Sequence, residues 1–455
     1  MSRRVAVVGA GMGGLAAAIR LAERGYGVTL FEARGRVGGL ASSVEAADST
    51  FDGGPYILLD RPGLEWAFGE LGLDLGRELE LTRIESVYEV RSEEGPVIRF
   101  HADPDRTAEE MDCLWPGCGA RFRGLVEKLG RIHRDTLPLL FLSRPKARHL
   151  LRPRVFRHAA FLRSDLDSVL RRTGLPAEIR RALAIWTHIA GREPREAPSL
   201  LALVPALIHS PGAYYPKGGM ATIGERLFRR ALSLGVDVRL DTPVQKLHFG
   251  ERARPRAQVD GEQIPFDAIV SNAGGLGTYL GLVADLPARA RRRLEGLPLQ
   301  SPGICIYLRV KSNPEPPYLR FFLLPGSGGC RLFVRPGALG DDAGTARLIA
   351  PAEPEDEERT LARVLQEDWW KPFAGESEVL ATRTPTSWGR EFRLHRNGMN
   401  PVMTARLLRA GRLPHRSPYF ERLYLAGSAT HPGQWVSFSV ISGILAADVL
   451  DQDLG

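Results

Sequence analysis

The sequence predicts an α/β fold built around a parallel sheet whose strands come from both ends and the middle of the chain. Near the N-terminus, a buried strand at Arg4–Val8 runs through a glycine-rich loop into an Ala-rich helix at Leu15–Ala22. A second buried strand is expected at Phe266–Ala273, and a third at Leu423–Gly427 precedes a helix at Val436–Leu450. Strand–loop–helix units of this kind are typical of Rossmann-type nucleotide-binding domains.

The loop after the first strand carries the dinucleotide fingerprint G-x-G-x-x-G in its required context. Gly9 permits a tight turn, Gly11 lets the backbone approach a pyrophosphate, and Gly14 lets helix and strand pack closely. The helix N-terminus offers N–H donors and a partial positive charge to the phosphates. The next strand, Val28–Phe31, ends on Glu32, which would accept hydrogen bonds from the adenosine ribose hydroxyls. An acid there argues against a 2′-phosphate and therefore against NADP.

The residues after Glu32 distinguish NAD from FAD. The run Ala33-Arg34-Gly35-Arg36-Val37-Gly38-Gly39 continues the nucleotide loop with basic residues and a glycine pair. It resembles the R-x-G-G extension of FAD-dependent amine oxidases and carotenoid desaturases, in which the loop wraps the cofactor, and nicotinamide enzymes usually lack it. FAD is therefore the expected cofactor. Because the segment Gly427–Gly433 contains no cysteine, we expect FAD to be bound non-covalently.

Length and composition are those of a globular, enzyme-sized protein. The 455 residues suit two or three lobes, and a hydrophobic content of 44% is sufficient for a full core. No apolar run is long enough to span a bilayer, and the N-terminal strand belongs to a nucleotide fold rather than a signal peptide, so a cytoplasmic location is expected. The cysteines Cys113, Cys118, Cys305 and Cys330 form neither a disulfide framework nor a metal-ligand pattern, and no metal is expected.

Further motifs follow the nucleotide loop in order along the chain. They are Phe51-Asp52-Gly53-Gly54-Pro55, Tyr215-Pro216-Lys217-Gly218-Gly219-Met220, Val270-Ser271-Asn272-Ala273 and Leu423 to Gly433. With the Gly9 to Gly39 stretch, they make the chain resemble the phytoene (carotenoid) desaturase family, within the FAD-dependent amine oxidase and desaturase superfamily. The resemblance covers nearly the whole length of the chain.

Fingerprint and resemblance together imply a set of cofactor-binding residues. The set is Gly9, Gly11, Met12, Gly13, Gly14, Glu32, Ala33, Arg34, Arg36, Gly38, Gly39, Leu40, Gly54, Pro55, Val244, Asn272, Gly427, Ser428 and Val436. Val244 is expected in a strand, with its backbone at the adenine. His431 is a candidate catalytic base, and a structural or flavin-adjacent role for it stays open. Apart from His431, the catalytic residues are not identified.

The order of the segments predicts a domain organisation. The FAD-binding domain would comprise residues 1–105, 214–280 and 416–455. Residues 106–213 would form a helical lobe that contacts substrate and membrane, and residues 281–415 a strand-rich, mixed-sheet substrate domain inserted between the nucleotide-binding parts.

The positive charge of the chain is concentrated in one segment. Residues 121–181 hold sixteen Lys or Arg and five Asp or Glu, whereas the whole chain carries a net charge of +8. Leucines and phenylalanines are interleaved with these arginines, and the resemblance implies a membrane-contacting surface here. An anionic membrane is therefore the expected partner, although a solvated basic face is an alternative. No recognition motif accompanies the charge, so nucleic-acid binding is not expected.

These observations lead to one expected reaction and several alternatives. The resemblance implies a flavin enzyme that introduces double bonds into a long hydrophobic isoprenoid, with a carotenoid such as phytoene or a derivative as substrate, and with oxygen or a quinone as electron acceptor. Gln434–Phe438 is bulkier than the small residues usual there, which leaves open another polyene or lipid. An amine oxidase, a redox-neutral isomerase or saturase, and a non-catalytic flavin-binding scaffold are the alternatives.

Overall fold

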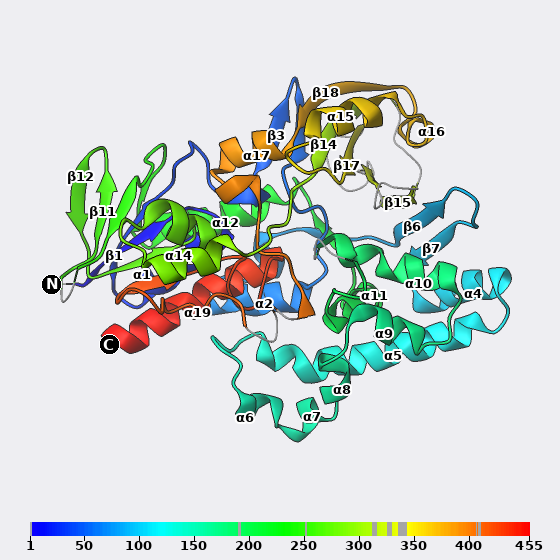
Figure 1. The fold of residues 1–455 in the computed structure, drawn as a ribbon, viewed down its shortest axis with the longest axis horizontal. Helices are drawn as coiled ribbons and strands as arrows, with labels where there is room; N and C mark the ends of the chain where they lie inside the picture. Colours follow the sequence, from blue (N-terminus) through cyan, green and yellow to red (C-terminus); the bar gives the residue numbers. More distant parts are fainter. Residues whose placement is uncertain are drawn as a thin grey trace.

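A parallel sheet organises one end of the molecule in the computed structural model, which describes residues 2–189, 193–250, 253–311, 316–324, 330–334, 344–405, 407 and 411–455. The strand order is β19-β13-β1-β2-β9 (Figure 1). The strands are β1 (Arg4–Val8), β2 (Gly27–Phe31), β9 (Asp237–Arg239), β13 (Ala268–Ser271) and β19 (Leu423–Leu425). All neighbouring pairs run parallel, so the predicted α/β fold with a parallel sheet is confirmed.

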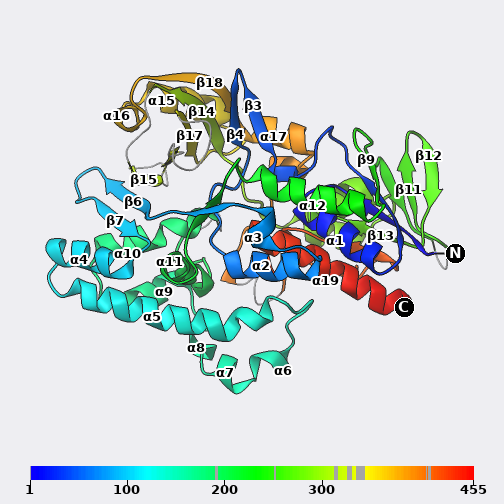
Figure 2. The ribbon, with the colours of Figure 1, turned by 180° about the vertical axis from the view of Figure 1, so that it is seen from behind.

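Helices from distant parts of the chain cover one face of this sheet, as Figure 2 shows from behind. They are α1 (Met12–Glu23), α2 (Arg61–Glu70), α3 (Leu75–Glu78), α12 (Ala221–Ser233) and α19 (Val436–Leu454). Helix α1 packs against both α12 and α19, and α19 also contacts α2. The first two turns of α1 consist mainly of Gly, Ala and Leu and are buried, because small side chains allow close helix contacts.

Beside the parallel sheet lies a small antiparallel sheet, β10 (Lys246–His248), β11 (Arg256–Val259) and β12 (Glu262–Pro265). Helices α13 (Gly275–Gly277) and α14 (Ala288–Glu295) follow β13. Val244 precedes β10 in an extended stretch and lies outside any strand, which corrects the prediction that it belongs to one. It is buried, because it packs in the same core cluster as Phe31 and Leu247.

A second, mixed sheet has the order β18-β14-β17-β16-β15-β6-β7. Its strands are β6 (Ser86–Ser92), β7 (Ile98–His101), β14 (Ile304–Val310), β15 (Leu319–Leu323), β16 (Cys330–Val334), β17 (Thr345–Ala350) and β18 (Ser377–Arg383). Strands β6 and β7 fall within the predicted 1–105 nucleotide-binding segment, but β6 pairs with β15. The physical reason is an aromatic cluster, since Tyr88 on β6 stacks on Phe100 and meets the edge of Phe321.

Further helices and hairpins complete this half. Helices α15 (Glu357–Gln366), α16 (Lys371–Ala374) and α17 (Pro385–Phe392) follow strands of the mixed sheet, so residues 281–415 contain helices as well as strands. Two short antiparallel pairs, β3 (Ser43–Ala46) with β4 (Ser49–Asp52) and β5 (Leu81–Arg83) with β8 (Tyr214–Pro216), lie outside both large sheets.

Helices occupy most of residues 104–209, which agrees with the helical content predicted for residues 106–213. They are α4 (Pro104–Leu114), α5 (Cys118–Thr136), α6 (Ala147–Leu150), α7 (Pro153–Phe156), α8 (Ala159–Leu162), α9 (Leu166–Arg171), α10 (Ala177–Ala184) and α11 (Leu203–His209). Prolines punctuate them, since α7 starts at Pro153 and Pro176 precedes α10. Within the described residues, none of the helices is both long enough and apolar enough to cross a bilayer. Helices α6 and α7 project from the rest of the molecule (Figure 1).

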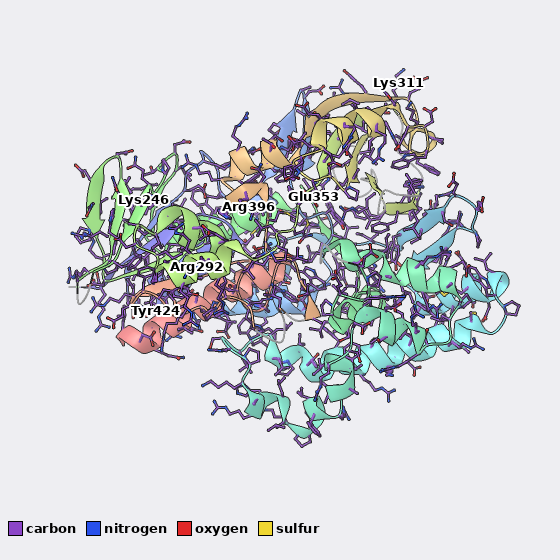
Figure 3. All side chains as sticks on the ribbon, viewed as in Figure 1. Lys246, Arg292, Lys311, Glu353, Arg396 and Tyr424 are labelled. Atoms are coloured by element: carbon purple, nitrogen blue, oxygen red, sulfur yellow. The ribbon has the colours of Figure 1, made fainter. Side chains whose placement is uncertain are left out.

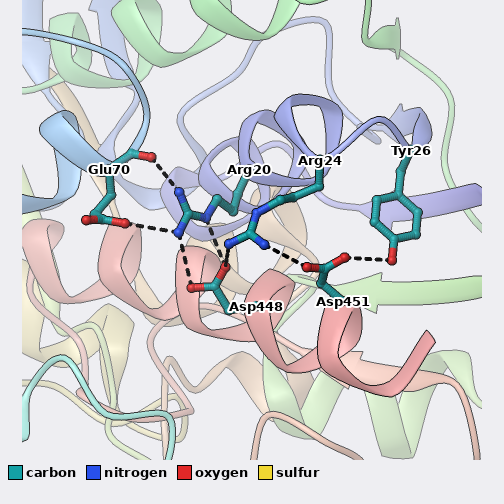
Figure 4. A network of polar contacts seen from close by, with 6 residues as sticks. All are labelled: Arg20, Arg24, Tyr26, Glu70, Asp448 and Asp451. Carbon is teal, nitrogen blue, oxygen red and sulfur yellow. Dashed lines mark hydrogen bonds and ion pairs between the residues drawn. The ribbon is translucent and has the colours of Figure 1, made fainter. Parts of the chain in front are cut away.

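A network of charged groups ties α1, α2 and α19 together (Figure 4). The Arg20 guanidinium donates to Asp448 at 2.9 Å, to the Glu70 carboxylate at 3.0 Å and to the Glu70 carbonyl at 2.9 Å. One turn on, Arg24 pairs with Asp448 at 3.3 Å and with Asp451 at 2.8 Å. The Arg20 side chain is 16% exposed and that of Arg24 is 43% exposed, so solvent screens the second arginine more.

This difference predicts unequal stability effects for the two arginines. Arg20→Met should lower the free energy of unfolding by about 2 kcal/mol, because it removes charge-assisted hydrogen bonds from a mostly buried position. Arg24→Met, the matched control on the same helix, should cost less than about 1 kcal/mol. Urea denaturation measures both without the screening that guanidinium would introduce. Equal losses would show that burial of Arg20 does not matter.

Candidate functional site

The glycine loop between β1 and α1 brings the backbone close to Asn272, which follows β13. Gly9 has a φ of +95°, and a Cβ on Gly14 would lie 1.9 Å from the Gly9 carbonyl oxygen. A Cβ on Gly11 would lie 2.7 Å from the Asn272 amide nitrogen, and one on Gly13 would lie 2.7 Å from its amide oxygen. No side chain caps the N-terminus of α1, and its first turn holds no acid. The helix end therefore suits an external anion such as a pyrophosphate.

Glu32 lies directly after β2 and is only 8% exposed. One carboxylate oxygen accepts from the Ala10 N–H at 2.7 Å, and the other accepts from the Arg34 N–H at 3.0 Å. Burial raises the pKa of Glu32, and the two backbone N–H groups and the Arg34 charge oppose this rise. Each oxygen retains lone pairs, so the carboxylate can also accept hydroxyl donors such as those of a ribose.

The basic residues of the nucleotide loop are held by a helix more than 350 positions further along the chain. Arg34 and Arg36 both pair with Glu391 on α17, at 2.7 and 3.2 Å. Arg34 also donates to the Ser42 hydroxyl at 3.2 Å and lies over the Phe392 ring. The sequence reasoning missed Glu391 and Phe392, because no local motif marks them.

A buried arginine fixes the loop at Gly53 and Gly54. Arg347 on β17 is 2% exposed and donates to the carbonyl oxygens of both glycines at 3.0 Å. On the other side of the loop, the Asp52 carboxylate accepts from the Tyr215 hydroxyl and from the Met220 N–H, each at 2.7 Å. The Phe51–Pro55 and Tyr215–Met220 motifs are thus joined through Asp52, a pairing that the sequence did not reveal.

These segments surround one large cavity with a volume of about 1810 Å³. Most of the expected cofactor-binding residues line it. They are Gly9, Gly11, Met12, Gly13, Glu32, Ala33, Arg34, Gly38, Gly39, Leu40, Gly54, Pro55, Val244, Asn272, Gly427, Ser428 and Val436. Gly14 and Arg36 lie outside the described lining, because Gly14 packs on the Gly9 carbonyl and Arg36 turns to Glu391.

The C-terminal motif lies at the same cavity. Gly427 has a φ of +91°, and its N–H donates to the Ser442 hydroxyl at 2.8 Å. The Ser428 hydroxyl donates to the Asn400 amide oxygen at 2.9 Å. Helix α19 begins at Val436 with no side-chain cap and no acid in its first turn, so its positive end also faces the cavity.

His431 lies outside the described lining of the cavity, which argues against it as the catalytic base. Its Nε2–H donates to the Leu139 carbonyl at 2.9 Å, which directs the ring toward the helical lobe. Burial lowers the pKa of His431 to about 4. The geometry is that of a neutral histidine joining two segments of the chain.

Beyond the nucleotide-binding residues, the cavity lining combines many apolar side chains with charged ones such as Glu178, Arg181 and Glu353. Its lining there includes Ile57, Leu58, Leu59, Leu114, Trp115, Ile185, Trp186, Phe321, Leu323 and Leu324. The rings of Trp186 and Phe321 meet at 5.6 Å. Glu353, which also lines the cavity, lies in Figure 3 between Lys246 on the nucleotide side and Lys311 on the side of the mixed sheet. The cavity exceeds the usual volume of a small-ligand site, about 300–1,000 Å³, so it can hold a dinucleotide and a second, apolar molecule.

Comparison with known proteins agrees with this geometry. The family model for flavin-containing amine oxidoreductases matches residues 12–451. The chain is 26% identical to a 4,4'-diapolycopene oxygenase of Methylomonas sp, over 100% of this chain and 99% of that protein. It is 31% identical to a zeta-carotene-forming phytoene desaturase of Myxococcus xanthus, over 69% of this chain and 61% of the relative.

Solved structures share the fold. A putrescine oxidase bound to putrescine has a TM-score of 0.64 at 20% identity, over 99% of both chains. A CLA-producing fatty acid isomerase from P. acnes has a TM-score of 0.66 at 15% identity, over 99% of this chain and 98% of the isomerase. At these identities the likeness concerns the fold alone. Both curated relatives named above are enzymes of carotenoids. From the family model, the chain belongs to the flavin-containing amine oxidoreductase family.

Proposed function

We propose that this protein is an FAD-dependent oxidoreductase that introduces double bonds into a long hydrophobic isoprenoid, with a carotenoid such as phytoene or a derivative as substrate. The observation that carries the proposal is the continuity of the cavity. A single space is lined both by the glycines and Glu32 of the nucleotide-binding segments and by Leu, Ile, Trp and Phe side chains. A dinucleotide cofactor and an apolar substrate would share this space.

The residues present fit non-covalent FAD. The uncapped N-terminus of α1 would hold the pyrophosphate, and Glu32 would hold the ribose of the adenosine. The loop at Gly53 and Gly54, held by Arg347, and the start of α19 would enclose the flavin ring. When bound, the flavin would accept a hydride from a saturated carbon, and oxygen or a quinone would reoxidise it. The protein would orient the substrate and exclude water through the apolar lining.

The aromatic residues at the start of α19 argue against an amine oxidase activity. Trp435 and Phe438 stack on each other with ring centroids 4.9 Å apart and planes 19° apart. Two rings in this contact leave no gap between them in which an amine could be caged by cation–π interactions. Trp435 also lines the cavity, where its bulk would restrict the shape of the substrate.

The projecting helices suit contact with an anionic membrane. Leu150, Leu151 and Phe156, on and between α6 and α7, are 44%, 64% and 57% exposed. Arg152 and Arg154 lie between them, and neither forms an ion pair with any residue that the structure describes. Apolar groups could enter the headgroup boundary while the arginines meet anionic lipid, which would give a water-insoluble substrate a route to the protein.

The first prediction from this proposal concerns the cofactor. Heating and centrifuging the purified protein should release one FAD per chain into the supernatant. Glu32→Ala should weaken FAD binding by about 1–3 kcal/mol, because a buried charge-assisted hydrogen bond is lost. Glu262→Ala, an exposed change on β12, is the matched control and should retain full occupancy. Flavin that stays in the pellet, or release of NAD, would contradict the proposal.

A second prediction concerns the membrane. In flotation with anionic liposomes, Leu151→Ser/Phe156→Ser should bind at least about tenfold more weakly than wild type, because burying even one such side chain contributes about 1.5–3 kcal/mol. Leu232→Ser is the control, since Leu232 is 48% exposed but lies on α12. Binding should weaken with salt. Equal binding to neutral and anionic liposomes would show that electrostatic attraction to anionic lipid does not contribute to binding.

A third prediction concerns the reaction. In a host that makes phytoene, the protein should yield a pigment that absorbs at longer wavelengths and has lost hydrogen by mass spectrometry, whereas Glu32→Ala should yield much less. Purified protein should lose its flavin absorbance anaerobically when given the substrate in liposomes, and recovery with oxygen or with a quinone identifies the acceptor. An unchanged mass with altered spectra would indicate an isomerase. Bleaching by amines alone would favour an amine oxidase.

A further inference from the structure

Asp60 is a buried carboxylate on the cavity wall that the nucleotide-binding residues do not account for. Along the chain, Asp60 follows the apolar lining residues Leu58 and Leu59 and directly precedes α2, and it is 2% exposed. One carboxylate oxygen accepts from the Gly63 N–H at 3.2 Å, as a helix cap does. The other oxygen accepts from the Ser437 hydroxyl at 2.9 Å, and Ser437, in the first turn of α19, also lines the cavity.

The other carboxylates of the described lining are placed differently. Glu32 is engaged at the nucleotide end by backbone N–H groups. The remaining ones are exposed or half-buried: Glu93, Glu94, Glu178, Glu193, Glu196, Glu353 and Glu391. Asp60 is therefore the buried acid beside the apolar lining and the start of α19. Water therefore has little access to Asp60. A group that exchanges protons with a hydrocarbon requires such a water-excluded position.

Among the residues that the structure describes, no ionic partner neutralises Asp60. Burial raises its pKa, and the hydrogen bonds from Ser437 and Gly63 oppose the rise without a contribution from any charged side chain. The charged residues on the helices that pack around it are engaged elsewhere, since Arg61 pairs with Glu65, and Arg20 pairs with Glu70 and Asp448. The further charges on these helices are Glu23, Arg24, Asp451 and Asp453, and each has a partner of its own.

We propose that Asp60, oriented by Ser437, accepts the proton that the substrate loses. This inference rests on the proposed function. In the reaction, two neighbouring saturated carbons each lose a hydrogen. One leaves as a hydride to the flavin oxidant, and the other leaves as a proton to an Asp60 carboxylate oxygen. The electron pair of the second C–H bond becomes the new carbon–carbon double bond, so atoms and electrons balance.

Asp60→Asn separates proton transfer from the structural role. The Asn amide oxygen can still accept from the Gly63 N–H, and its NH₂ group can donate to the Ser437 hydroxyl, but it cannot take up a proton. With equal FAD content, the rate of anaerobic flavin bleaching by the isoprenoid should fall at least about 100-fold, the usual contribution of a general base. Ser437→Ala should keep measurable activity and shift the acidic limb of the pH–rate profile, since it removes a bond that favours the ionised form.

A second readout does not depend on turnover. Because the pKa of Asp60 is raised in the folded protein, its neutral carboxyl contributes fully to the free energy of unfolding below the ordinary Asp pKa of about 3.9. This contribution is lost as the pH rises through the folded-state pKa. Asn does not ionise. The urea midpoint of Asp60→Asn, measured relative to that of wild type, should therefore rise as the pH increases from about 4.

The outcomes separate the two proposals. If wild type is bleached by an isoprenoid and Asp60→Asn reacts within about threefold of it, Asp60 is not the base and the proposed function stands. If wild type is bleached by no isoprenoid, the proposed function fails and the inference fails with it. If Asp60→Asn does not retain FAD, the test passes to Ser437→Ala. An unchanged pH–rate profile in Ser437→Ala then overturns the inference.

Discussion

The close contact between α1 and α19 is the constraint on which the site depends. A Cβ on Gly443 would lie 2.1 Å from the Gly13 carbonyl oxygen, and a Cβ on Gly13 would lie 2.8 Å from the Gly427 nitrogen. Only glycine at these positions lets helices from opposite ends of the chain approach so closely. The Arg20 network then holds the far side of the contact. As a result, the uncapped N-termini of both helices open onto one cavity.

The second constraint is how the mixed sheet is fixed to this unit. Arg347 binds the carbonyls of the loop after β4, and Glu391 binds the two arginines of the nucleotide loop. Both groups belong to the half of the molecule that contains the mixed sheet, yet they hold loops of the N-terminal segment that line the cavity. An arginine buried to 2% exposure would be costly if left unpaired, so the carbonyls that it satisfies cannot move away without penalty. These contacts therefore fix the mixed sheet and α17 to the loops that line the cavity.

Local patterns in the sequence were enough to predict the elements around the cofactor. The glycine loop, the acid after β2 and the C-terminal helix each lie within a short window, where backbone and packing requirements select residue types directly. Contacts between distant segments leave no such pattern. Glu391 and Arg347 look like ordinary surface and strand residues in the sequence, and β6 joins the mixed sheet through aromatic packing on Phe321. The contact that His431 makes could not be predicted for the same reason, because its partner, Leu139, lies nearly 300 residues away.

Asp60 is a residue whose surroundings can be recognised only in the structure. In the sequence it precedes Arg61-Pro62-Gly63 and is typical of a helix cap, which explains one of its two oxygens. The second oxygen is held by α19, whose start is placed by the glycine contact with α1. Burial favours the neutral acid, whereas the positive ends of α2 and α19 favour the carboxylate. These two effects oppose each other, and the proposed role requires that Asp60 takes up and releases a proton in each turnover.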